Sequence, residues 1–134
     1  MNADKAIQTL IEELDFEPRT ARTYVRANGY CEYCGEELIR NRLGYACAQI
    51  DHLLPRSKFP AEVYELENNF VLSCSLCNSL KSNISVLQEN EDPMTMLTKQ
   101  RHVLLARAKD EIVKQLKEPN RKWEIAKSVF GRNG

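Results

Sequence analysis

Two cysteine pairs with the spacing Cys-x-x-Cys constrain this chain more than any other feature of its sequence. Cys31 and Cys34 form the first pair in the sequence, and Cys74 and Cys77 form the second. Each pair can bring two thiolates to one ion from a tight turn, and four thiolates form the closed tetrahedral site typical of structural zinc. The alternative is that one or both pairs are buried thiols, which pack well in cores. We predict a structural Zn2+ site with these four ligands and no open position for water.

The fifth cysteine, Cys47, and the first residues of the chain indicate the cellular compartment of the protein. Cys47 has no partner at this spacing, and we expect it to be a small buried residue in a strand. An odd number of cysteines in a chain that opens without a basic and apolar leader indicates a reducing compartment. The sequence has no long apolar stretch. We therefore expect a cytoplasmic protein without a membrane partner.

The length of 134 residues fits one domain. We expect a single unit with a helical N-terminal flank (1–29), a zinc-bound core (30–88) and a helical C-terminal flank (93–134). The 19 basic and 19 acidic side chains cancel, so composition gives no sign of a nucleic-acid partner and weighs against a strong nonspecific DNA binder. Any nucleic-acid function must rest on local chemistry.

Hydrophobic periodicity predicts an α+β fold in which helices flank a small strand-containing core. The first helix should stop near Asp15, and the second should begin at Pro18 and end at Asn28-Gly29. The remaining expected elements are strands at 45–50 and 70–73, a helix from 76 to about 86, a long helix over 97–116, and a short last helix carrying Trp123, Ala126 and Phe130. Pro119 should end or kink the long helix.

Aspartate, histidine and asparagine residues gather between and just after the cysteine pairs. Asp51-His52 is followed by a Leu-Leu-Pro loop, Asn68-Asn69 leads the strand Phe-Val-Leu-Ser, and Asn78 follows the last cysteine. In this order, about residues 31–83 resemble the HNH nuclease family. In that family a strand ending in Asp-His, a loop, an Asn-led strand and a helix form a ββα-metal core. Asn78 stands where many members have His, so the chain is similar to the HNN type.

The resemblance assigns roles by position. It implies that Asp51 and Asn78 bind one catalytic divalent metal and that His52 activates water as the general base. It also implies that Asn69 braces the loop that orients His52, although the neighbouring Asn68 is an alternative for that role. The implied function is a metal-dependent endonuclease that hydrolyses phosphodiester bonds in nucleic acid, with DNA as the expected substrate.

Elementary chemistry agrees with these roles. A neutral imidazole such as His52 can accept a proton from water near physiological pH. A hard cation can stabilise the charge that gathers on phosphate oxygens in the transition state. The Asp51 carboxylate and the Asn78 carbonyl are oxygen ligands, which favour Mg2+ or Mn2+. Because Asp51 and His52 are adjacent, both can face the metal only where their strand ends or twists.

Polar side chains near this cluster are candidates for substrate binding. Lys81 and Ser82 share one face of the expected helix with Asn78, and Arg56 and Lys58 follow closely after His52. All four could contact phosphate, which gives affinity without reading base sequence.

A basic stripe on the second helix is equally consistent with phosphate contacts and with an ordinary solvated face. It consists of Arg19, Arg22 and Arg26.

The C-terminal helices carry apolar stripes that should pack on the core, while a homodimer or a partner protein is the alternative. We expect His102, on one of these helices, to have no catalytic role. The rival to the nuclease is a noncatalytic zinc module that binds nucleic acid or protein. Such a module has no need for Asp51, His52 and Asn78 together, which favours the enzyme.

Overall fold

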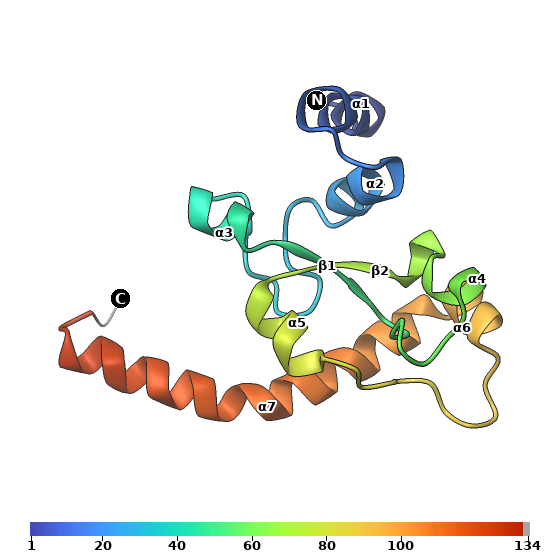
Figure 1. The fold of residues 1–134 in the computed structure, drawn as a ribbon. Helices are drawn as coiled ribbons and strands as arrows, with labels where there is room; N and C mark the ends of the chain where they lie inside the picture. The colour runs from blue at the N-terminus through green and yellow to red at the C-terminus, as the bar shows by residue number, and fades with distance from the viewer. Residues whose placement is uncertain (133–134) are drawn as a thin grey trace.

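The computed structural model describes residues 1–132 and confirms the α+β fold. A two-stranded antiparallel sheet lies among helices from both ends of the chain (Figure 1). In chain order the described elements are α1 (Ala3–Leu14), α2 (Pro18–Arg26), α3 (Arg42–Ala46), β1 (Gln49–His52), α4 (Ala61–Tyr64), the 3-10 helix η1 (Glu67–Asn69), β2 (Phe70–Ser73), α5 (Ser75–Lys81), α6 (Pro93–Lys99) and α7 (Arg101–Val129).

The sheet lies at the centre of this arrangement. His52 is the last residue of β1 and pairs with Phe70, the first residue of β2. The N-terminal helices lie on one side of the sheet, where α2 contacts β2, and α7 runs along the other side, where it contacts α5 (Figure 1). Strand β1, strand β2 and helix α5 therefore form a ββα unit.

Local signals set the ends of the first two helices as predicted. Asp15 stops α1 in a left-handed conformation with φ of 57°. Pro18 begins α2, and the Glu17 side chain accepts hydrogen bonds from the backbone N–H groups of the first turn. Beyond α2, Asn28 and Gly29 turn the chain with positive φ, a conformation that Gly tolerates well.

The predicted first strand is wrong in its bounds. Residues 42–46 form α3, and β1 begins only at Gln49. The side chain of Asn41 explains the difference, because its Oδ1 accepts a hydrogen bond of 2.8 Å from the N–H of Gly44 and caps the helix. Cys47 consequently caps the end of α3 and is half-buried, whereas a buried strand position was expected.

The C-terminal helices also differ from expectation. Helix α5 ends at Lys81, several residues early, because Ser82 has a φ of 47°. The long helix breaks at Gln100, which separates α6 from α7, and then continues through Pro119 to Val129. A proline removes one helical hydrogen bond, but α7 does not end at Pro119, so Trp123 and Ala126 lie on α7 and not on a separate last helix as expected. In the part of the chain that the structure describes, no helix is long and apolar enough to span a bilayer.

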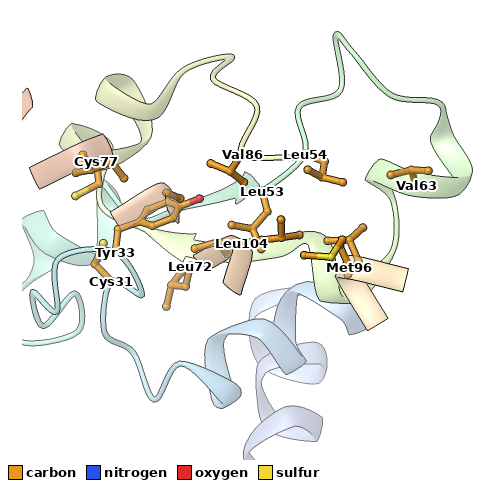
Figure 2. Close-up of a cluster of buried hydrophobic side chains, with 14 of the residues drawn as sticks. Cys31, Tyr33, Leu53, Leu54, Val63, Leu72, Cys77, Val86, Met96 and Leu104 are labelled. Carbon is orange, nitrogen blue, oxygen red and sulfur yellow. The ribbon is translucent and has the colours of Figure 1, made fainter. Parts of the chain in front are cut away.

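The hydrophobic core joins the sheet and its following loop to α6 and α7 (Figure 2). Leu53 and Leu54, directly after His52, are fully buried, as are Leu72 of β2 and Leu104 of α7. Complete burial of such side chains contributes about 1.5–3 kcal/mol each. The loop that follows His52 is thus anchored in the core.

The C-terminal half of α7 leaves this core. In Figure 1 it extends beyond the rest of the molecule. Trp123, Val129 and Phe130 are more than half exposed there, whereas Ala108 and Ile112 of the first half are buried. Only the first half therefore packs as predicted for the C-terminal helices.

Candidate active site and metal centres

The four paired cysteines come together in space. The sulfur atoms of Cys31, Cys34, Cys74 and Cys77 all lie within 4.8 Å of one another, and 3.9 Å separates Cys34 Sγ from Cys74 Sγ. Four thiolates about 2.3 Å from a central zinc would be separated by similar distances. The donor set and its spacing thus fit a tetrahedral zinc site.

Two different local structures build this cluster. The Cys31–Cys34 turn, which we call the first knuckle, closes with a 2.8 Å hydrogen bond from the Gly35 N–H to the Cys31 carbonyl. Gly35 has a φ of 80°, which favours glycine. In the second pair, Cys74 caps α5, and its sulfur accepts a hydrogen bond from the Cys77 N–H. The cysteines join the loop before the sheet to the helix after it.

A pocket of about 470 Å³ lies at the end of β1, beside α5. Asp51, His52 and Asn78 all line this pocket. Asp51 and His52 share it because β1 ends at His52, which is where adjacent strand residues can face the same space. Its other lining residues, several of which the sequence analysis did not single out, are Pro55, Arg56, Ser57, Ser79, Ser82 and Asn83.

Aromatic rings hold the His52 imidazole at the pocket. It meets the ring of Phe70 edge-on at a centroid distance of 5.4 Å and the ring of Tyr64 at 6.0 Å. Burial lowers the pKa of His52, the Asp51 carboxylate opposes that shift, and the cation of Arg56 adds to it. The ring is therefore neutral at neutral pH, which is the form that can accept a proton.

Two oxygen donors that share the pocket with His52 fit a hard cation. Asp51 offers a carboxylate, and Asn78 offers an amide carbonyl from the middle of α5. The Asn78 Nδ2 donates to Oε1 of Gln49, which leaves the Asn78 carbonyl oxygen for another partner. Carboxylate and amide oxygens are the ligands that Mg2+ and Mn2+ prefer. The chemistry of these donors therefore suits a single divalent cation.

Asn69 lies under the loop that follows His52. Its side chain is fully buried, and its Oδ1 accepts a 2.7 Å hydrogen bond from the Leu54 N–H. Its Nδ2 donates to the carbonyl oxygens of Leu54 and Tyr64, both at 3.0 Å. The neighbouring Asn68 is exposed and donates instead to the Leu97 carbonyl in α6. Asn69 thus contacts the loop after His52, and Asn68 does not.

We expect Asn69→Ala to lower the free energy of unfolding by about 2–4 kcal/mol, because it leaves buried backbone groups of Leu54 and Tyr64 without partners. Asn68→Ala, the matched control, should cost less than about 1 kcal/mol because Asn68 is exposed. Urea denaturation of the two zinc-loaded variants measures both values. Equal losses would assign no special bracing role to Asn69.

Lys81 lies inside the protein, behind residues that line the pocket, and does not line the pocket itself. Its side chain is fully buried, its Nζ donates a 2.6 Å hydrogen bond to the His52 carbonyl oxygen, and it lies 3.4 Å from Oδ2 of Asp51. Ser82 lies outside α5, so the two residues do not share a helix face as expected. This buried placement does not favour the expected contact between Lys81 and a substrate phosphate.

The other expected substrate contacts have more open positions. Arg56 and Ser82 are exposed and line the pocket, and the Arg56 guanidinium lies 5.3 Å from the centre of the Tyr64 ring. Lys58 is exposed on the same loop but does not line the pocket.

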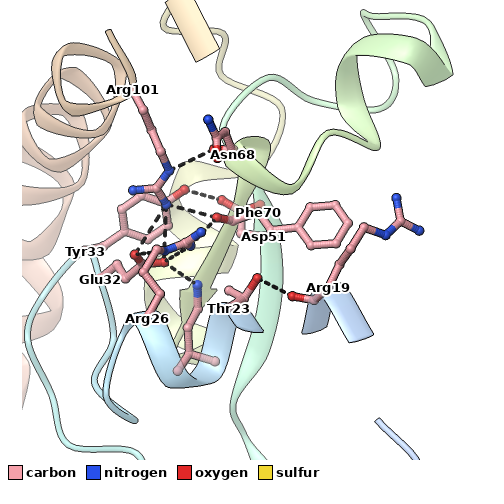
Figure 3. A network of polar contacts seen from close by, with 10 residues as sticks. Arg19, Thr23, Arg26, Glu32, Tyr33, Asp51, Asn68, Phe70 and Arg101 are labelled. Carbon is pink, nitrogen blue, oxygen red and sulfur yellow. Dashed lines mark hydrogen bonds and ion pairs between the residues drawn. The ribbon is translucent and has the colours of Figure 1, made fainter. Parts of the chain in front are cut away.

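The basic stripe on α2 is largely occupied by internal partners. Arg22 pairs with Glu67 at 2.7 Å, and Arg19 donates to the Glu65 carbonyl at 2.7 Å. Arg26 pairs with Glu32 and donates to the Phe70 carbonyl oxygen (Figure 3). The stripe thus holds α2 against the sheet, and this arrangement favours the structural interpretation over phosphate contacts.

Glu32, inside the first knuckle, is a structural residue that the sequence analysis missed. Its carboxylate accepts hydrogen bonds from Arg26, from Arg101 of α7 and from the backbone N–H of Leu72 (Figure 3). It thereby ties both helical flanks to β2. No sequence spacing signals these contacts, because Arg101 lies 69 residues from Glu32.

Tyr33 is the second residue that the sequence analysis missed. It lies between the cysteines of the first knuckle, and its hydroxyl donates a 2.6 Å hydrogen bond to Asp51 Oδ2 (Figure 3). Burial raises the pKa of the Tyr33 hydroxyl well above its ordinary value, so the hydroxyl keeps its proton and remains a donor.

Comparison with known proteins yields one match. The family model described as HNH endonuclease matches residues 31–83, from the first cysteine of the first knuckle to the end of the pocket lining. No curated protein and no solved structure matches the chain.

Proposed function

We propose that this protein is a metal-dependent endonuclease that hydrolyses phosphodiester bonds, with DNA as its substrate. The match of residues 31–83 to the HNH endonuclease family model supports this proposal. The observation that carries the proposal is the meeting of His52, Asp51 and Asn78 at one pocket. A general base and two hard oxygen ligands at one site are what metal-assisted phosphodiester hydrolysis needs. A noncatalytic binding module would gain nothing from this combination.

Each residue at the pocket has a proposed role. The His52 imidazole accepts the proton of the attacking water, and its packing against Phe70 and Tyr64 keeps the ring in place. Asp51 and Asn78 hold Mg2+ or Mn2+, which supplies a positive charge near the phosphate and leaving oxygens. Asn69 keeps the loop after His52 in position through its backbone hydrogen bonds.

A structural Zn2+ bound by the four cysteines is the second cofactor in this proposal. The spacing of the sulfur atoms supports it. With four thiolates the ion has no open position, so its part is to hold the first knuckle against α5. The two metal sites therefore differ in chemistry, with sulfur ligands at one and oxygen ligands at the other.

Substrate contacts are proposed for exposed polar residues around the pocket. Arg56 and Ser82 line it, and Lys58 lies on the loop beside it. Cationic contacts of this kind bind phosphate without reading base sequence. Since the chain has no net charge, these local contacts must supply the affinity that composition does not.

The projecting half of α7 remains a proposed surface for a second copy or a partner protein. Its exposed Trp123, Val129 and Phe130 support this proposal. Sedimentation of the purified chain distinguishes a homodimer from a monomer, and a monomer would leave this surface for a partner protein.

The experiment that tests the metal site changes Asn78. We expect Asn78→Ala to lose activity and Asn78→His to retain part of it, because an imidazole can occupy the same coordination position. The change from an oxygen to a nitrogen donor should lower the Mg2+-dependent rate and raise the relative rate in Ni2+ or Co2+. Cleavage rates of the three proteins in each metal measure this.

Asn83, which lines the same pocket, offers a matched control for Asn78. Asn83→Ala should keep the metal preference of the wild type. If Asn78→Ala cleaves with the wild-type rate and metal dependence, Asn78 is not a ligand.

A further inference from the structure

We propose that Tyr33 is a positioning residue that fixes the Asp51 carboxylate for the catalytic cation and so connects the first knuckle to the active site. The inference rests on the proposed function, because it concerns the metal ligand of that same pocket. It goes further in giving the residue between two zinc-ligand cysteines a part in binding the second metal.

One carboxylate oxygen of Asp51 is held from two sides. The Tyr33 hydroxyl donates to Oδ2 at 2.6 Å, and Lys81 Nζ lies 3.4 Å from the same atom (Figure 3 shows the tyrosine contact). Tyr33 is 5% exposed, Lys81 is fully buried, and Asp51 is 8% exposed. Hydrogen bonds to an ionised acceptor are short and strong, especially where water is excluded. Oδ2 therefore interacts with buried groups of the protein and does not face the pocket.

The other oxygen, Oδ1, is left for a ligand. Within residues 1–132, no hydrogen bond to Asp51 Oδ1 is found, and no buried side-chain oxygen lacks a partner, so Oδ1 reaches accessible space. Asp51 lines the pocket with Asn78 and His52. With Oδ2 fixed, the carboxylate can present only Oδ1 toward that pocket. Asp51 would then bind a cation through one oxygen, already oriented.

The position of Tyr33 follows from the zinc-binding turn. The side chain lies between Cys31 and Cys34, so the geometry of the first knuckle directs the ring into the core toward β1. Ligands of a metal are themselves oriented by hydrogen-bonding partners, whose removal typically weakens metal binding by roughly 10- to 100-fold. Tyr33 has this relation to Asp51.

A purely structural role for the hydroxyl gives different expectations. If it only satisfied a buried carboxylate, Tyr33→Phe would lower the stability of the fold and leave the affinity for the cation unchanged. If it positions Asp51, the variant should bind the cation more weakly, and raising the cation concentration should restore the cleavage rate. Rescue by mass action separates the two roles.

The test is a Mn2+ titration of the zinc-loaded full chain. Calorimetry and the electron paramagnetic resonance signal of free Mn2+ both measure the binding. Tyr33→Phe should keep the wild-type zinc content, bind Mn2+ roughly 10- to 100-fold more weakly, and regain its cleavage rate at high Mn2+. Tyr30→Phe is the matched control, because Tyr30 is exposed and directly precedes the first knuckle. It should bind Mn2+ like the wild type.

The outcomes separate the inference from the proposed function. A wild-type chain that binds no Mn2+ overturns both. A wild type that binds Mn2+ and a zinc-loaded Tyr33→Phe that binds it equally well overturn the inference alone. If Tyr33→Phe does not retain zinc, the wild-type chain supplies a second measurement, the carboxylate stretching bands in infrared difference spectra with and without Mn2+. Binding of Mn2+ through both oxygens of Asp51 would overturn the inference, because Oδ2 would then not be held by Tyr33.

Discussion

Cys77→Ser should give a chain that retains no zinc and does not fold. Cys77 is 1% exposed and is one of the four clustered sulfur ligands. Binding of structural zinc contributes roughly 10–16 kcal/mol in small domains, whereas the whole stability of a domain is roughly 5–15 kcal/mol. Loss of one ligand therefore removes a contribution as large as the stability itself. Elemental analysis and circular dichroism of the purified variant measure both effects.

The control is Cys47→Ser. Cys47 is half-buried at the end of α3 and lies outside the cluster, so this variant should keep its zinc and its fold. A Cys77→Ser chain that is folded, stable and free of metal would contradict the zinc assignment. If Cys47→Ser also failed to fold, loss of folding would not distinguish a zinc ligand from a cysteine needed for packing, and the zinc content of each variant would decide.

His52→Ala should reduce the cleavage rate by roughly 100- to 10,000-fold, the usual contribution of a general base. The variant keeps all four cysteines and both oxygen ligands, so its zinc content and circular dichroism spectrum should match those of the wild type. Single-turnover cleavage of DNA at saturating Mg2+ measures the rate without a contribution from product release.

His102→Ala is the matched control for this variant. His102 is exposed on α7, and the pocket is lined without it. It should cleave at the wild-type rate. If His52→Ala also cleaves at that rate, the general-base assignment is wrong.

Prediction from sequence succeeded where a short local pattern decides the structure. The two Cys-x-x-Cys pairs, the ends of α1 and α2, and the bounds of β2 all depend on a few neighbouring residues. It failed for the bounds of β1, because the helix capped by Asn41 includes residues 45 and 46 of the strand predicted at 45–50. A single side-chain hydrogen bond thus outweighed a weak periodicity.

Long-range contacts explain the remaining differences. Lys81 has the chemistry of a phosphate-binding residue, but the carboxylate that receives it lies 30 positions earlier, at Asp51. Arg22 likewise finds Glu67 at a separation of 45 residues. Helical spacing shows which side chains share a face, but it does not show which opposite charges the fold will bring to that face. Tyr33 was missed because its partner, Asp51, lies 18 residues further along the chain.

One measurement tests the endonuclease proposal most directly: nicking of supercoiled plasmid DNA by the zinc-loaded wild-type chain in Mg2+, in Mn2+ and in EDTA. We predict relaxed and linear products with either cation, none in EDTA, and recovery when excess Mg2+ is added after a brief exposure to EDTA. Single-stranded DNA and RNA in the same buffers extend the test to other substrates. Intact plasmid, single-stranded DNA and RNA in every metal, from a protein that is folded and holds its zinc, would contradict the account.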